Sequence, residues 1–198
     1  MAEKLLAFYI FALSAAITPG PTNVLVMSVG AARGWRGALP CLAGVVLGMG
    51  ALIAATSAGL AGLLRLVPQL TMLLGWAGAL LLLYMAWKVA RSPGRPGEAG
   101  ARDLGFWPAF GFQWINPKSW VVGVSAAAAF GDLVARHPVI GPAVLGMTFA
   151  AAVAPSSLVW LLFGTALRGW LSSPRRARWF ARTMGAALAL SVLLIVRP

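Results

Sequence analysis

The chain has 198 residues, of which 60% are hydrophobic and only 10% are charged, and its mean hydropathy is +0.85. Because soluble domains average about 25% charged residues, this composition predicts an integral membrane protein. The formal net charge of +12 does not favour nucleic-acid binding, since the basic residues fall between hydrophobic segments instead of forming one stripe.

Six apolar segments are long enough to cross about 30 Å of hydrocarbon as helices. The predicted spans are Leu5–Val29, Leu39–Leu64, Val67–Trp87, Phe106–Phe130, Val139–Gly164 and Trp179–Val196. The connections between them are too short for a separate soluble catalytic domain. The predicted fold is therefore an all-α membrane protein with six transmembrane helices.

The first span contains an irregular segment, Thr18-Pro19-Gly20-Pro21-Thr22-Asn23. Proline has no backbone N–H, so Pro19 and Pro21 leave the carbonyls of Ala15 and Ile17 without their usual helical donors. Such a break persists in a membrane only where protein, water or a ligand replaces the lost bond. Gly20 adds freedom to unwind or to admit a close neighbour.

The second span carries Gly44 and Gly48, a pair of small residues four positions apart. Such a face lets helices approach closely, and it is compatible with a homodimer as well as with packing inside the chain. Cys41 in the same span is the only cysteine, and we interpret it as a small buried apolar residue.

A polar segment rich in Gly and Pro, Lys88–Gly105, divides the chain into halves with three spans each. We therefore predict a first repeat at 1–89, a cytoplasmic linker at 90–105 and a second repeat at 106–198. Because three is odd, the second half would enter the membrane in the opposite orientation, as in inverted-repeat transporters.

The fourth span repeats the irregularity of the first, with Gln113-Trp114-Ile115-Asn116-Pro117-Lys118. Pro117 frees the carbonyl of Gln113 in the same way. A lysine within an apolar span is costly and marks a functional site by default. Near the outer end of this span, Asp132 lies one turn from Arg136, and we expect a surface pair, with a role in proton coupling as the alternative.

Basic residues set the predicted topology. Eleven of the 16 lysines and arginines lie in the first, third and fifth connections, and four lie on the opposite side. The positive-inside rule then places these three connections in the cytoplasm and both termini outside.

The residues that most enzymes and metal sites need are scarce. The chain has one histidine, His137, and four acids, all near span ends or in connections: Glu3, Glu98, Asp103 and Asp132. No metal-ligand cluster, phosphate-binding loop or Ser-His-Asp arrangement follows from the sequence, and a thiol-electron carrier would need paired cysteines. We therefore expect neither an enzyme nor a bound cofactor or metal.

The two breaks together predict a binding site. Broken helices present positive N-terminal ends to a carboxylate and free carbonyls to an ammonium group, which is the charge pattern of an amino acid. The predicted site residues are Pro19, Gly20, Pro21, Thr22, Asn23, Gln113, Asn116, Pro117 and Lys118. The simpler alternative is a pair of ordinary proline kinks.

The same motifs resemble a known family, the lysine exporter (LysE/RhtB) family of bacterial amino-acid exporters. The resemblance rests on Pro19-Gly20-Pro21 with Thr22 to Leu25, Gly34, Gly37, Gly44, Gly48 and Asn116-Pro117-Lys118. It implies export of amino acids or related small metabolites across the cytoplasmic (inner) membrane, by exchange with protons. Many members have an acid directly after Pro-Gly-Pro, whereas this chain has Thr22, so the resemblance leaves the proton-coupling residue unidentified.

The charges then favour one substrate class. Lys118 brings a positive charge to the site, and a basic side chain would enter without a buried counter-charge, at a cost of several kcal/mol. We therefore expect neutral amino acids over basic ones, unless Asp132 reaches the cavity. A passive channel or a structural membrane protein is the alternative, and it would show no substrate counterflow.

Overall fold

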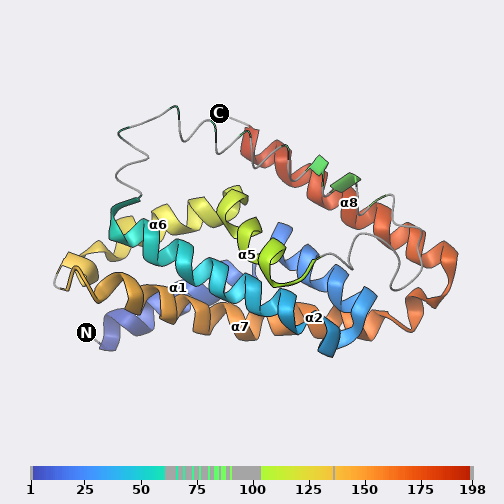
Figure 1. Cartoon of the computed structure of the whole chain (residues 1–198), viewed down its shortest axis with the longest axis horizontal. Coiled ribbons are helices and arrows are strands. Elements are labelled where there is room, and N and C mark those ends of the chain that lie inside the picture. The colour runs from blue at the N-terminus through green and yellow to red at the C-terminus, as the bar shows by residue number, and fades with distance from the viewer. Residues whose placement is uncertain are drawn as a thin grey trace.

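The computed structural model describes residues 2–60, 104–135 and 137–196, with separate positions between 66 and 90. In these residues the regular elements are helical and no strand occurs. They are α1 (Ala2–Ile17), α2 (Pro21–Ala55), the π-helical η1 (Thr56–Leu60), α5 (Phe106–Ile115), α6 (Pro117–Ala135), α7 (Gly141–Leu167), the 3₁₀ turn η2 (Trp170–Ser172) and α8 (Pro174–Val196). Figure 1 shows their arrangement.

Several helices begin at a proline. Pro21, Pro117 and Pro174 are the first residues of α2, α6 and α8. A proline fits this position because its fixed φ is helical and the missing N–H would have no intrahelical partner anyway. Pro21 and Pro117 thus start new helices, so the simple-kink alternative is wrong for both. Pro40 and Pro155, by contrast, lie inside α2 and α7.

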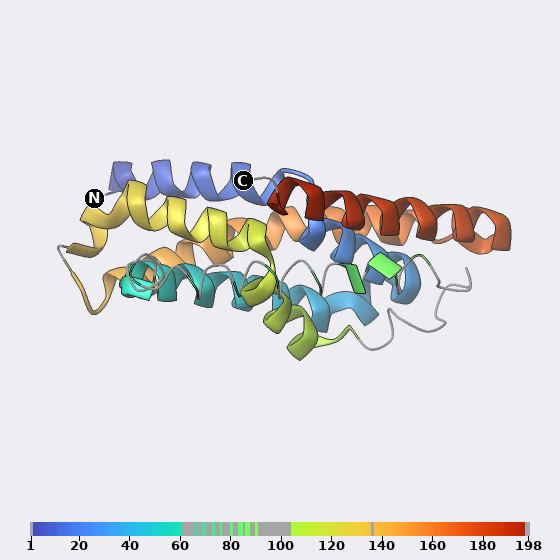
Figure 2. The same ribbon diagram turned by 90° about the horizontal axis from the view of Figure 1, so that it is seen from above.

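The long helix α2 consists of two segments joined at Gly34. This glycine has φ 73° and ψ 173°, a left-handed conformation that favours glycine. Figures 1 and 2 show the chain reversing direction here, so that the second segment runs back alongside the first. The end of the first predicted span, its short basic connection and most of the second span therefore fall within one helical hairpin.

By length and apolar composition, three helical stretches of the described residues are long enough to cross a membrane: Pro21–Gly59, which contains the reversal at Gly34, Pro117–Ala135 and Gly141–Leu167. α1 has only 16 residues, and α8 begins with an arginine-rich turn, five residues before the predicted start of the sixth span. The predicted third span and most of the linker lie outside the described residues. The all-helical, apolar character of the chain is confirmed.

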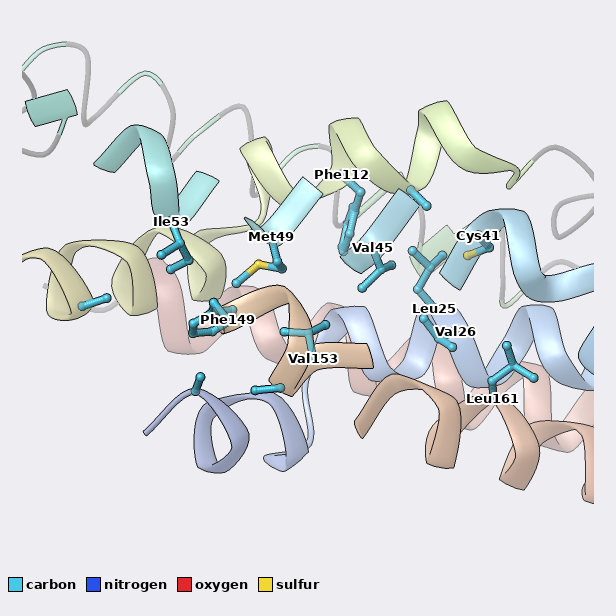
Figure 3. Close-up of a cluster of buried hydrophobic side chains, with 14 of the residues drawn as sticks. Leu25, Val26, Cys41, Val45, Met49, Ile53, Phe112, Phe149, Val153 and Leu161 are labelled. Atoms are coloured by element: carbon cyan, nitrogen blue, oxygen red, sulfur yellow. The ribbon is translucent and has the colours of Figure 1, made fainter. Parts of the chain in front are cut away.

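The main core lies where α2, α5 and α7 meet, with α1 and α6 closing it. Figure 3 shows Val45 and Met49 of α2 facing Phe149 and Val153 of α7. Cys41 belongs to this cluster and is fully buried, as the sequence predicted for a small apolar residue.

The small residues predicted to allow close packing do so inside the chain. A Cβ at Gly48 would lie 2.8 Å from the carbonyl oxygen of Phe110, and Gly44 meets the Phe106 carbonyl at least as closely. Both glycines therefore bring α2 against α5, and a homodimer must use a different surface.

Candidate functional site

The two interruptions predicted from the sequence lie side by side. Gly20, between α1 and α2, is fully extended with φ and ψ both at −179°. Asn116, between α5 and α6, is also extended, with φ −79° and ψ 113°. Hydrogen bonds between side chains connect the two segments directly. The fold thus brings residues nearly a hundred positions apart into one site.

A neutral hydrogen-bond network joins the breaks. Asn116 donates its side-chain amide to Thr22 Oγ1 at 3.0 Å, and the Thr22 hydroxyl donates to Gln113 Oε1 at 3.1 Å. Ser119 donates to the same Gln113 oxygen at 3.3 Å, and Gln113 Nε2 donates to the Ala109 carbonyl at 3.1 Å. Gln113 and Asn116 are essentially inaccessible to solvent. Buried polar groups satisfied in this way hold a rigid geometry.

The carbonyls at the end of α1 accept hydrogen bonds from a side chain of α2. Asn23 donates its amide to the carbonyls of Ala16 at 3.1 Å and Thr18 at 3.0 Å. These are not the carbonyls of Ala15 and Ile17 that the prolines singled out. The reason is that α1 ends at Ile17. Ser14 keeps a bond from the Thr18 N–H, but the carbonyls after it lose their helical donors, and Asn23 in the first turn of α2 reaches back to Ala16 and Thr18.

Lys118 connects α6 to the end of α1. Its ammonium Nζ donates to the Thr18 carbonyl at 2.6 Å. Gly20 makes this contact possible, because a Cβ at this position would lie 3.0 Å from Lys118 Cδ and 3.1 Å from Nζ. An ammonium can donate three hydrogen bonds, so this contact leaves donors for an anion.

The backbone on the α5 side is capped as well. The Lys118 N–H, first in α6 after the proline, donates to Asn116 Oδ1 at 3.2 Å. Trp120 donates its indole N–H to the Trp114 carbonyl at 2.6 Å. Both bonds replace partners that a continuous helix would have supplied, so the break is built by the local sequence itself.

A narrow cavity of about 40 Å³ opens between the breaks. Its polar side is formed by Thr22, Asn23, Asn116, Lys118, Ser119 and Ser157, and its apolar side includes Met49, Val122, Phe149 and Val153. A space of this size suits water, so an organic ligand requires the surrounding helices to move apart.

Five of the nine predicted site residues line this cavity: Gly20, Thr22, Asn23, Asn116 and Lys118. Gln113 lies behind Thr22, and the three prolines shape the backbone without lining the space. The sequence missed the wall contributed by α2 and α7. The available signal was Pro155 followed by Ser156 and Ser157, a proline and two hydroxyl groups within an apolar segment. In the structure, Ser156 Oγ is buried without a hydrogen-bond partner and Ser157 lines the cavity.

Asp132 does not line the cavity. It forms an ion pair with Lys4 of α1, and both side chains are about half exposed. The predicted partner, Arg136, lies outside the described residues. Asp132 comes fourteen positions after Lys118 in the sequence, or about 21 Å along a helix of that length. The acid is therefore far from the polar residues of the breaks.

The model of the LysE type translocator family matches residues 13–196. No solved structure matches the chain.

Curated relatives cover almost all of the sequence. A cysteine/O-acetylserine efflux protein of Salmonella choleraesuis is 34% identical over 187 residues, which is 93% of this chain and 91% of the relative. The protein of the same name from Klebsiella pneumoniae is 32% identical over 95% of this chain and 96% of its own length. The one from Escherichia coli K12 is 36% identical over 63% of this chain and 64% of its own length. The family resemblance found in the sequence is confirmed: the chain belongs to the LysE type translocator family.

Proposed function

We propose that this protein exports small neutral amino acids across the bacterial cytoplasmic membrane, and that the cavity between the two breaks is the substrate site. The observation that carries the proposal is the position of Lys118. Its ammonium lines a cavity whose other described polar residues are uncharged, and it is held by a single backbone carbonyl.

A substrate carboxylate would compete with that carbonyl for the ammonium. The bond to Thr18 is charged on the donor side only, whereas a carboxylate adds the opposite charge and can also accept from the remaining N–H donors of the ammonium, so it would draw Lys118 away from Thr18. Releasing Thr18 separates the end of α1 from α6, and this movement widens the cavity. Binding of substrate is thereby coupled to opening.

The rest of the cavity favours a small neutral side chain. Thr22 and Ser157 offer hydroxyl groups, and Phe149 and Val153 form an apolar wall. Among the described residues the lining holds no carboxylate to pair with a basic side chain, and an unpaired charge there would cost several kcal/mol. The names of the relatives, which refer to cysteine and O-acetylserine efflux, fit this substrate class.

The arrangement in the membrane is part of the same proposal. The chain forms two inverted three-helix repeats, 1–89 and 106–198, joined by a cytoplasmic linker at 90–105, and it crosses the membrane six times with both termini outside. Support comes from the equivalence of the two breaks, since a short helix, an extended residue and a proline-initiated helix occur in each half.

The test is transport by the full chain in inside-out vesicles, with and without a pH gradient. We expect counterflow of cysteine, O-acetylserine or serine, and little competition from lysine or arginine. Lys118→Gln should reduce uptake tenfold or more, because it removes the charged partner of the carboxylate. The matched control is Lys4→Gln, which removes an exposed lysine far from the cavity. Normal transport by Lys118→Gln would reject the site, and absence of counterflow for every amino acid would favour the passive channel.

Proton exchange is tested in the same vesicles through Asp132. Because this acid is paired with Lys4 outside the cavity, we expect Asp132→Asn to leave export and its response to a pH gradient unchanged. We propose Lys118, the ionisable residue of the cavity lining, as the coupling group. Loss of the pH response in Asp132→Asn, with folding intact, would assign coupling to Asp132 instead.

A further inference from the structure

A second charged feature lies at the opposite end of the molecule from Lys4 and Asp132, where the Gly34 bend of α2 meets the end of α7 and the start of α8 (Figure 1). Arg33 immediately precedes the bend, and its Nη1 is buried with no hydrogen-bond partner. A buried, unpaired guanidinium nitrogen is costly and calls for an explanation.

The packing of α2 on α7 fixes a second arginine at the same bend. Gly30 and Gly164 let the two backbones touch, and Thr165 donates its hydroxyl to the Gly30 carbonyl at 3.4 Å. One turn later, Arg168 ends α7, and its Nη1 lies 3.0 Å from where a Cβ of Gly34 would be. The close helix contact therefore holds the Arg168 guanidinium against the residue next to Arg33.

The local helix ends only partly offset these charges. Arg33 and Arg168 each lie at the C-terminal end of a helical segment, and each end is equivalent to about half a negative charge. Two full positive charges therefore retain about one in excess. The described acids, Glu3 and Asp132, belong to the other end of the molecule (Figure 1). No described carboxylate therefore balances the two arginines, and a bound anion would do so.

The surroundings identify the kind of anion. Trp35 and Trp170 are both about half exposed beside the bend, and each carries an arginine over its ring, Arg36 at 5.0 Å and Arg176 at 5.6 Å. Tryptophans are enriched at the membrane interface, where their rings lie at headgroup depth, and anionic headgroups attract arginines to the same depth. On the proposed topology this end faces the cytoplasmic leaflet, which is rich in anionic lipid.

We propose that Arg33 and Arg168 bind the phosphate of one anionic phospholipid at the Gly34 bend. The small apolar cluster of Ala31, Leu171 and Ala177, which packs α2 against η2 and α8, holds the site together. The bound phosphate bridges the hairpin of α2 to the end of α7, and so it stabilises the arrangement of these helices.

The test uses the purified full chain in detergent, with phosphatidylglycerol or phosphatidylcholine of the same acyl chains added in steps. The readouts are the thermal unfolding midpoint and the number of lipids retained in native mass spectrometry. We expect phosphatidylglycerol to be retained as one tight lipid and to raise the midpoint. Arg33→Gln and Arg168→Gln should each weaken this binding about tenfold. Arg178→Gln, an exposed arginine of α8, is the matched control and should bind as the wild type does.

Four results would overturn the proposal. Equal stabilisation by phosphatidylcholine would show that the negative charge is not recognised. An equal loss of phosphatidylglycerol binding in Arg178→Gln would show that the arginines attract anionic lipid only diffusely. Full stabilisation by inorganic phosphate without added lipid would identify a free anion as the ligand. If a glutamine variant does not fold, Arg168→Lys is used instead, because it keeps the charge but loses the planar fork of N–H donors. Unchanged affinity of Arg168→Lys for phosphatidylglycerol would also reject the site.

Discussion

The position of the Lys118 side chain depends on two other residues, Gly20 and Thr18. Lys118 comes from α6, the Thr18 carbonyl is exposed by the end of α1, and Gly20 leaves the space in which the lysine lies. Gly20 is extended, a conformation open to any residue, so its importance is the missing side chain and not its backbone freedom. A substitution at Gly20 therefore tests the effect of an added side chain and not that of a strained backbone.

We predict that Gly20→Ala lowers export several-fold while the protein remains folded. The added Cβ would lie 3.0 Å from Lys118 Cδ, so the flexible lysine must shift and its bond to Thr18 weakens. Initial rates of export in vesicles measure the loss, and the thermal midpoint should stay nearly constant. Gly111→Ala is the control, because a Cβ there meets nothing within 4 Å. Wild-type export by Gly20→Ala would mean that the placement of Lys118 does not matter.

Asn23 shows what residue-level reasoning could and could not supply. The sequence marked it as a site residue because it follows the double proline. Its actual role, capping the carbonyls of Ala16 and Thr18, depends on where α1 ends and on the angle at which α2 leaves. Neither quantity is contained in the spacing of the prolines.

At the level of elements, the contact between α2 and α7 holds the molecule together. Gly164 lies against the Met27 carbonyl, and Gly50 and Gly146 face each other farther along the same pair. Helices in a membrane gain little from hydrophobic burial against each other, so close backbone packing of this kind supplies much of their association.

Gly164→Ala should therefore destabilise the protein strongly. A Cβ would overlap the Met27 carbonyl oxygen, a backbone atom that cannot turn away, so the helices must separate. Overpacking of this kind costs about 1–3 kcal/mol, and we expect the thermal midpoint in detergent to fall by several degrees. In Gly169→Ala, where nothing lies within 4 Å, the midpoint should be unchanged. An equal midpoint in both variants would contradict the close contact.

For the whole molecule, the distribution of basic residues predicts the orientation. Ala2, at the start of α1, should face outside, and Ser172, in η2 beside the arginine-rich start of α8, should face the cytoplasm. Both residues are exposed and lie at opposite ends of the molecule (Figure 1).

Single cysteines at these two positions test the topology. In intact cells, an impermeant thiol reagent should label Ala2→Cys and should label Ser172→Cys only after the membrane is opened. Cys41 is buried and serves as the unlabelled background. Labelling of Ser172→Cys in intact cells would show that the orientation is opposite to the predicted one. The proposed phospholipid site would then lie in the outer leaflet.

Composition and local chemistry by themselves determined that the chain is apolar and helical, and they predicted that its functional segments surround Pro21 and Pro117. These properties follow from transfer free energies and from the missing proline N–H, which act within a few residues of their source. The same local signals identified the family, because its motifs are those segments.

Only the tertiary structure decided which groups meet. The bond of Lys118 to Thr18, the wall formed by Phe149 and Val153, and the pairing of Asp132 with Lys4 all join elements distant in sequence. Such contacts depend on the angles and depths at which helices pack, and those are set by glycines such as Gly30 and Gly164, whose partners lie on another helix. A sequence pattern shows that a helix can approach a neighbour closely, but the neighbour and the register are properties of the folded chain.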